Sequence, residues 1–491
     1  MKKVLNLLVI LLVFLVFSCS SSHSSNDTDM IPDSDADSDV IETVDDDSDS
    51  QSHEIVDDSD DVSDFDDSDS DETPSCEEED EEEFDDEDVI TSYTRCYDEI
   101  PDEPYEGFFA DPDLGYWVKR SLGYDEDYEL TEEDLEKVTR VSVYSQDIRG
   151  IEKLINLEYV KISGNNVYDF TPLSKLEKLK EMKIDGKNID CLDESFALLT
   201  HLETLEIRET KLTDVSPIEQ LVDLKSLDVG DSEIEFLPKN LGHLQKLEFL
   251  AFSHNNIKSI KPVKSLIRLK ELYFHYNHIE DICPIRNLVN LTSFGAQGNR
   301  IKDISAVAKL VNLTWLGLIE NQIERIPEDF VNLKKLKTCQ LLYNNISKLP
   351  ELKGLDSLDE MWIGSNDLTD EDFMKLDALE TVRFMDVALC KKITKVPVMK
   401  NLKSLQELYL NYNSITDLSG FADNESFPAL KSVYLGSNKI SDAEALRHRE
   451  GLNRLSIGKN CIQDLSPLEE LKERGTYISG MNEQLESCED K

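Results

Sequence analysis

The chain has 491 residues, and its 103 Asp and Glu outnumber its 51 Lys and Arg, which gives a formal net charge of −52. The excess is uneven, because residues 20–94 hold 33 acidic residues and no Lys or Arg, whereas residues 95–491 carry a net charge of −21. A body of that second size can bury a large core or form a long repeat array. Nucleic acid is excluded as a partner, since both regions repel phosphate and no basic stripe offsets them.

The amino terminus has the pattern of an export signal. Two lysines precede an apolar run over residues 4–17 whose only polar member is Asn6. About 20 apolar residues are needed to span a bilayer, so this shorter run predicts a signal peptide over residues 1–18. The string VFSC that ends at Cys19 resembles a bacterial lipobox, with a bulkier Phe17 than usual. The resemblance implies lipidation at Cys19 and a membrane anchor in the bacterial outer membrane; the alternative is a plain signal peptide with Cys19 incidental.

Residues 19–94 are dominated by Asp, Glu and Ser, in strings such as PDSDADSDV and EEEDEEEFDDED. Such a segment buries too little apolar surface to offset its ordering entropy, so we expect a disordered acidic tether behind the lipidated Cys19. A calcium loop needs a glycine turn and a closing Glu at fixed spacing, and the segment supplies neither. Loose binding of divalent cations stays open.

From residue 138 onward, apolar residues recur with a period near 22. Copies such as LKELYFHYNHI (269–279) and LQELYLNYNSI (405–415) fit the pattern LxxLxLxxNxI. About 15 units fill residues 138–470, with starts at 138, 157, 179, 202, 224, 247, 269, 291, 313, 336, 358, 379, 405, 430 and 452. The period-two alternation of the central LxL predicts a short strand with inward leucines, and successive strands should pair in parallel.

These repeats resemble the leucine-rich repeat family, and return segments such as ITDLSG and IQDLSPL resemble the 22-residue class of bacterial internalins. The resemblance implies an α/β fold. It would be a horseshoe-shaped solenoid with a parallel concave β-sheet, short 3₁₀ or extended convex segments and a small helical N-terminal cap.

Both ends of such a solenoid need caps, because terminal repeats would otherwise expose their core. We expect a helical cap over residues 95–137 and a closing cap over residues 471–491. In the first cap, Asp111 as N-cap and Pro112 at the first helical position begin a helix that Gly123 ends. A second helix begins at Thr131, where an acid three residues later approximates a capping box.

The resemblance also implies a ladder of buried asparagines that bond the backbone of adjacent turns. Its members are Asn165, Asn255, Asn277, Asn299, Asn321, Asn344, Asn366, Asn413, Asn438 and Asn460. Five units depart from Asn at this position, with Gln146, Lys187, Thr210, Ser232 and Cys390, the last in a unit that we expect to be lengthened around residues 385–392. The amino-terminal ladder should therefore be less regular.

The cysteines and histidines give no catalytic pattern. Cys461–Cys488 in the closing cap and Cys76–Cys96 at the edge of the tether are candidate disulfides in an oxidising compartment. His254 and His275 fall on successive repeats near Asp231, and we interpret them as polar surface rather than a metal site. No GxSxG, P-loop or HExxH sequence occurs, so we expect a non-enzymatic protein with no metal and no cofactor.

The strand phase sends two kinds of side chain to the concave face. Early units present charged residues, namely Lys161, Lys183, Glu206, Arg208, Glu209, Asp228 and Asp231. Later units present mainly aromatic ones, namely Phe249, Tyr273, Tyr276, Trp315, Ile319, Leu342, Tyr343, Trp362, Tyr409, Tyr412 and Tyr434. Exposed aromatic patches often mark interaction sites. The alternative is stacking that only stabilises the sheet.

The predicted function is therefore recognition of a protein or carbohydrate partner through the concave face of a surface-tethered protein. A structural or self-associating envelope protein is the alternative.

Overall fold

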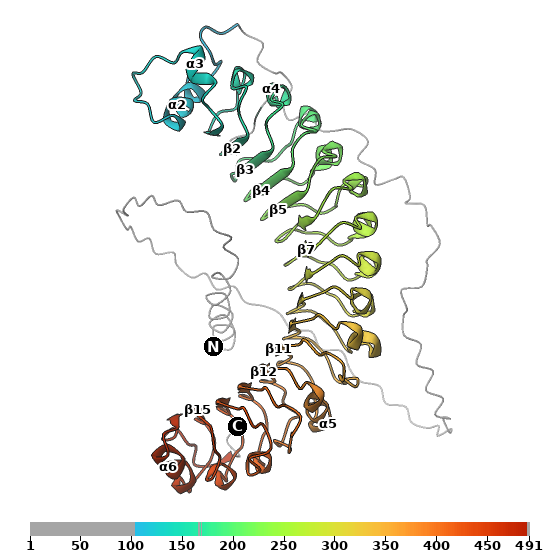
Figure 1. The fold of residues 1–491 in the computed structure, drawn as a ribbon, viewed down its shortest axis with the longest axis vertical. Helices are drawn as coiled ribbons and strands as arrows, with labels where there is room; N and C mark the ends of the chain where they lie inside the picture. Colours follow the sequence, from blue (N-terminus) through green and yellow to red (C-terminus); the bar gives the residue numbers. More distant parts are fainter. Residues whose placement is uncertain (1–103, 165–166, 168, 489–491) are drawn as a thin grey trace, which may run out of the picture. The chain divides into compact units, whose positions relative to one another are not determined.

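The computed structural model describes residues 104–164, 167 and 169–488. In this part of the chain a 16-stranded parallel sheet runs in chain order from β1 to β16, and it lines the inner side of a curved repeat array (Figure 1). The strands are β1 (Arg140–Val143), β2 (Tyr159–Ser163), β3 (Glu181–Asp185), β4 (Thr204–Arg208), β5 (Ser226–Gly230), β6 (Phe249–Ala251), β7 (Glu271–Tyr273), β8 (Ser293–Gly295), β9 (Trp315–Gly317), β10 (Thr338–Gln340), β11 (Glu360–Trp362), β12 (Phe384–Asp386), β13 (Glu407–Tyr409), β14 (Ser432–Tyr434), β15 (Arg454–Ser456) and β16 (Tyr477–Ser479). The predicted leucine-rich repeat solenoid is confirmed.

The strand register explains how the repeats share one core. Leu272 at the centre of β7 pairs with Leu250 of β6 and Phe294 of β8, and all three side chains are fully buried. Their flanking neighbours on each strand alternate to the other face, as the two-residue period of a strand requires. A continuous apolar core therefore runs behind the sheet, and alternate strand residues remain on the concave face.

Short turns return the chain along the convex side, as expected (Figure 1). The 3₁₀ turns are η2 (Ile151–Lys153), η3 (Glu194–Leu198), η4 (Ser216–Gln220), η5 (Leu241–His243), η6 (Lys261–Ser265), η7 (Cys283–Asn287), η8 (Ser305–Lys309), η9 (Glu328–Asn332), η10 (Leu376–Ala378), η11 (Ser419–Phe421) and η12 (Glu444–Leu446). Two short α-helices, α4 (Thr171–Ser174) and α5 (Asp370–Lys375), take the same place in their repeats.

The amino-terminal cap contains the two predicted helices. The side chain of Asp111 accepts a hydrogen bond from the Asp113 N–H and begins α2 (Pro112–Ser121). Thr131 and Asp134 form a reciprocal capping box at the start of α3 (Glu132–Leu135). The α2 side chains Leu114 and Val118 are buried against the first repeat, so the cap covers the end of the core.

The carboxy-terminal cap consists of α6 (Ser466–Glu473), β16 and a disulfide between Cys461 and Cys488, whose Cα atoms lie 5.5 Å apart. The closing cap was predicted to begin at residue 471. The helix α6 begins earlier, because the return segment of the last repeat continues into the cap. No helix among residues 104–488 that the structure describes is long and apolar enough to cross a membrane.

The twelfth repeat starts at Val382, three residues later than predicted. Val382 and Met385 are buried, and the strand residues Phe384 and Asp386 pair with their equivalents on β11 and β13. The later start places some of the extra residues before the strand. One extra residue also follows Cys390, as the predicted lengthening around residues 385–392 requires, because the Ser414 N–H bonds the Ile393 carbonyl just as the Asp367 N–H bonds the Ile346 carbonyl. The wrong start had placed Phe384 in the core, whereas the register places it on the concave face.

Several predictions fall on residues outside the described part of the chain. They are the signal peptide at 1–18, Cys19, the tether at 19–94, the Cys76–Cys96 pair and Asn165.

Candidate binding face

The concave face is formed by positions three, five, seven and eight of each repeat, counted from the first leucine. Position eight has a left-handed backbone in repeat after repeat, with φ of 57° at His254, 52° at Tyr276, 55° at Tyr343 and 59° at Tyr412. Non-glycine residues adopt this conformation only where surrounding contacts impose it. Here the N–H of position eight donates to the next repeat, as from Tyr276 to the Gln297 carbonyl at 2.7 Å.

The asparagine ladder imposes this turn. In Asn277, Oδ1 accepts from the Ile257 N–H at 2.9 Å, and Nδ2 donates to the Phe252 carbonyl of the preceding repeat at 2.8 Å and to the Phe274 carbonyl of its own repeat at 3.2 Å. Equivalent bonds occur at Asn255, Asn299, Asn321, Asn344, Asn366, Asn438 and Asn460. The ladder thus fixes the backbone that presents the concave side chains.

The ladder is weaker where asparagine is replaced. Thr210 and Ser232 share a hydroxyl–hydroxyl hydrogen bond of 2.7 Å. Cys390 occupies the ladder position of its repeat, and the Ile393 N–H turns back to the Cys390 carbonyl at 2.9 Å. That N–H would otherwise bond Asn413, so the Oδ1 of Asn413 is left without a hydrogen-bond partner.

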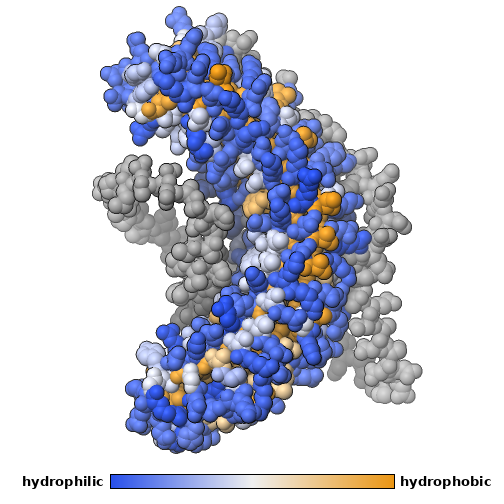
Figure 2. All heavy atoms as spheres, viewed as in Figure 1, coloured by the Kyte–Doolittle hydropathy of each residue, from blue (hydrophilic) through white to orange (hydrophobic). Residues whose placement is uncertain are grey.

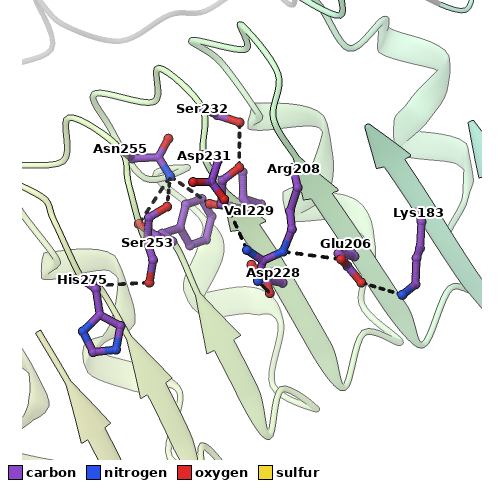
Figure 3. A network of polar contacts seen from close by, with 12 residues as sticks. Lys183, Glu206, Arg208, Asp228, Val229, Asp231, Ser232, Ser253, Asn255 and His275 are labelled. Atoms are coloured by element: carbon purple, nitrogen blue, oxygen red, sulfur yellow. Dashed lines mark hydrogen bonds and ion pairs between the residues drawn. The ribbon is translucent and has the colours of Figure 1, made fainter. Parts of the chain in front are cut away.

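The early repeats present a charged network (Figure 3). Lys183 pairs with Glu206 at 2.8 Å, and Arg208 reaches Glu206 at 3.4 Å, Asp231 at 3.3 Å and also Asp228. Burial raises the pKa of Asp228 even though Arg208 opposes the shift. These side chains largely satisfy one another, so little charge remains unpaired in this zone.

The middle repeats hold an aromatic cluster made of Phe249, Tyr273, His275 and Trp315. The Tyr273 ring centroid lies 5.8 Å from that of Phe249, 5.7 Å from His275 and 6.2 Å from Trp315. Gly295 lets the rings lie close to the backbone, because a Cβ there would come within 2.4 Å of the His275 ring. The pKa of His275 is lowered to about 4 by burial and, secondarily, by the nearby His254.

The two histidines do not form a metal site with Asp231. The His254 ring stacks on Tyr276 at 4.6 Å, whereas His275 stacks on Tyr273 and its Nδ1 accepts from the Gln297 N–H at 3.2 Å. Asp231 faces Arg208 instead. Within the described residues, no group of three His, Cys, Asp or Glu side chains could hold a metal ion.

The later repeats hold a second set of rings, which we call the aromatic column, made of Trp362, Phe384, Tyr409 and Tyr434. Successive ring centroids lie 4.2, 5.1 and 4.1 Å apart, and the first and last pairs are stacked. Each ring belongs to the next strand from β11 to β14, so the column crosses four repeats. Sequence reasoning missed Phe384 because of the three-residue error in the start of its repeat.

Of the other predicted concave residues, Tyr276 stacks on His254, and Tyr412 is 45% exposed. Tyr343 and Ile319 are half-buried, and no ring contact among the described residues joins Tyr343 or Tyr412 to either aromatic set. Leu342 is only 7% exposed, unlike the half-buried Ile319 at the same position of the preceding repeat, so its prediction as a concave surface residue is wrong.

Asp386 is a second concave residue that the sequence did not reveal. It lies on β12 in register with Trp362 on one side and Tyr409 on the other. Its carboxylate accepts a hydrogen bond from the Ala388 N–H at 2.8 Å. Burial raises the pKa of Asp386 to about 6, and the Ala388 N–H opposes this shift only in part.

Comparisons with known proteins agree with this architecture. The sequence pattern described as leucine-rich repeats in two copies matches residues 245–287 and 403–448. The crystal structure of an internalin (InlF) from Listeria monocytogenes is 26% identical with a TM-score of 0.51, over 76% of this chain and 95% of that chain. The leucine-rich repeat protein LIC12759 of Leptospira interrogans is 21% identical with a TM-score of 0.58, over 72% of this chain and 99% of that chain. No curated protein matches this chain significantly.

A third similar structure is the functional domain of InlJ from Listeria monocytogenes, at 21% identity and a TM-score of 0.53, over 74% of this chain and 77% of that chain. That domain includes a cysteine ladder, whereas the ladder described above consists mainly of asparagines, with a cysteine at position 390. The chain thus contains leucine-rich repeats, and its solenoid fold resembles those of bacterial internalins and of the Leptospira protein.

Proposed function

We propose that this protein is a non-enzymatic recognition protein that is tethered to the cell surface and binds a protein or glycan partner through its concave face. The observation that carries the proposal is the aromatic column, in which four rings from four successive strands lie side by side on the solvent side of the sheet. The core is complete behind the sheet without them. Aromatic side chains offer a large contact area for little conformational entropy, which makes them frequent hot spots of binding.

The backbone beneath the column supports binding because it is rigid before a partner arrives. The Asn366 side chain bonds both its own and the preceding repeat, and the Ile346 N–H completes the set. A preorganised face loses little entropy on binding. The internalin-like fold supports a protein-binding scaffold, and the identity of the partner is the open part of the proposal.

The anchor is proposed from the sequence alone. Cys19 would carry the lipid, and the acidic segment at 19–94 would hold the repeats away from the outer membrane. Replacing Cys19 with alanine should move the protein from the membrane fraction to the soluble fraction. Retention in the membrane fraction would contradict lipid anchoring at this residue.

The binding face is tested with a double variant, Trp362→Ala with Tyr409→Ala. The immobilised chain is used to capture partners, and the affinity of the captured partner is then compared between wild type and variant. We expect a loss of more than tenfold, because truncating hot-spot aromatics typically costs about 2 kcal/mol or more each.

The matched control is Phe236→Ala, which removes a ring that is 64% exposed on a return segment, away from the concave strands. It should leave the affinity unchanged. If the double variant bound as tightly as the wild type, the column would not be the binding face.

Self-association is a second candidate, which one further observation favours. Ile267, Val289 and Val311 take the same position in three successive repeats and are 55%, 45% and 47% exposed, and apolar residues gather over the middle repeats in Figure 2. Exposed apolar stripes of this kind favour protein contacts. Sedimentation velocity over a range of concentrations tests it, and a constant monomeric value would exclude it.

A further inference from the structure

The aromatic part of the concave face is also acidic, and its own strand positions supply no cation. From β6 to β14, positions three, five, seven and eight contain no Lys or Arg. They contain five half-buried carboxylates, namely Glu271, Glu320, Glu360, Asp386 and Glu407. In the charged network of the early repeats, by contrast, Lys183 and Arg208 neutralise their acidic neighbours. None of the five carboxylates forms an ion pair with another residue of the described chain.

Three of these carboxylates lie along the aromatic column. Glu360 accepts from the Trp362 indole N–H at 3.3 Å, and Glu407 accepts from the Tyr409 hydroxyl at 3.4 Å. Asp386 lies on the strand between them. Neighbouring parallel strands are about 4.8 Å apart, so three negative charges follow one another across the sheet beside the stacked rings.

The groups around Asp386 do not neutralise it. Glu360 and Glu407 on the adjacent strands are acidic, and Tyr343 and Cys390 carry no positive charge. Arg383 of the same repeat forms a two-pronged pair with Asp359 and acts only electrostatically on Glu360. Arg454 on β15 interacts with Tyr434 at the end of the column and electrostatically with Glu407, and it does not contribute to the pKa of Asp386. Burial accordingly raises the pKa of Asp386, whose ionised form lacks a cation.

A cation at this position would be stabilised in two ways. It would pair with a carboxylate that forms no ion pair within the described chain, and the apolar stem of its Lys or Arg side chain would pack against the half-buried rings of the column. A neutral sugar can stack on the rings but brings no charge to offset three carboxylates. A second copy of this face or an acidic partner would add like charges and be repelled.

We propose that the aromatic column is a docking site for a positively charged, extended segment of a partner protein. Lys or Arg side chains of that segment lie against Trp362, Phe384 and Tyr409 and pair with Glu360, Asp386 and Glu407. This assignment rests on the proposed recognition function and adds the chemistry of its partner.

The test uses the full chain and a fluorescent decapeptide of alternating Lys and Gly, with binding followed by anisotropy. The face variant is Glu360→Gln, Asp386→Asn and Glu407→Gln, which keeps the side-chain shapes and removes three charges. The control variant is Glu235→Gln, Glu324→Gln and Glu351→Gln, three exposed residues of the return segments. Both variants change the net charge equally and keep the acidic residues 20–94, so unspecific attraction of the peptide is matched.

We expect the face variant to bind the peptide at least tenfold more weakly than the control variant, which should stay within twofold of the wild type. Equal affinities of the two variants would overturn the proposal. A second measurement is specific to Asp386, since a bound cation should displace its proton near pH 6. Calorimetry in two buffers of different ionisation enthalpy should show proton release for the wild type and none for Asp386→Asn.

Two further ligands separate this inference from the proposed function. A Glu–Gly decapeptide should not bind. If a neutral oligosaccharide such as chitohexaose bound, with a loss in Trp362→Ala with Tyr409→Ala but none in the face variant, the column would be a glycan site. The cationic partner would then be excluded while the recognition function stood. If neither the captured partner nor any of these ligands distinguished the double aromatic variant from the wild type, both proposals would fail.

Discussion

Replacing Asn344 with alanine is expected to lower the free energy of unfolding by about 3–4 kcal/mol. The Oδ1 of Asn344 accepts from the Ile323 N–H at 3.0 Å, and its Nδ2 donates to the carbonyls of Leu318 at 3.0 Å and Leu341 at 3.1 Å. Alanine leaves these buried backbone groups without partners, and each unsatisfied group costs about 1–3 kcal/mol. Urea unfolding followed by circular dichroism measures the change.

The adjacent Asn345 provides the control, because its side chain is exposed and lies outside the ladder. Asn345→Ala should change the free energy of unfolding by less than about 0.5 kcal/mol. In a repeat array each unit depends on its neighbours. Hydrogen exchange therefore measures the amide protection of Asn344→Ala at two sites of the solenoid. Similar stabilities of the two variants would contradict a structural role for the ladder.

The second large effect is the pH dependence that His275 gives to stability. Burial lowers its pKa to about 4 in the folded chain, against 6.5 in the unfolded chain. Below pH 6.5 the unfolded chain therefore binds the proton more readily, and stability falls as the pH falls from 6.5 toward 4. The free energy of unfolding of the wild type should therefore be about 2 kcal/mol lower at pH 5 than at pH 8 because of His275.

His275→Phe keeps an aromatic ring above Gly295 and removes the titrating group, although the Gln297 N–H loses its acceptor. The free energy of unfolding of the variant, relative to that of the wild type, should therefore rise by about 2 kcal/mol when the pH is lowered from 8 to 5. His243→Gln, on an exposed histidine of η5, is the control and should leave the profile unchanged. A pH-independent difference between wild type and His275→Phe would show that His275 is not buried as the structure has it.

The same calculation has the opposite sign for Asp386, whose pKa is raised to about 6. Ionisation of a buried acid destabilises the folded chain as the pH rises through 6. Asp386→Asn should therefore be more stable than the wild type at pH 7.5, and this gain should disappear near pH 4. The ionised carboxylate of Asp386 thus lowers the stability of the folded chain at neutral pH. A role in binding a partner would explain why this position is acidic.

The repeat pattern in the sequence was sufficient to predict the fold. A period near 22 residues with leucines in alternation leaves one way to bury every repeat, which is to stack parallel strands over a shared core. The ladder position could be predicted for the same reason, since an asparagine recurs where the strand ends. The cap helix at Asp111 and Pro112 was also predictable, because capping depends on a few adjacent residues.

Tertiary structure alone decided the details of the concave face. A match to LxxLxL cannot distinguish a start at residue 379 from one at residue 382, because both place apolar residues at leucine positions; only pairing with β11 and β13 moves Phe384 into the column. The burial of Asp386 likewise depends on rings from neighbouring repeats, 22 or more residues away. The charge balance of the sequence thus located the acidic segment at 20–94, whereas the unpaired carboxylates beside the column became visible only when the strands were stacked, because stacking determines which charges have partners.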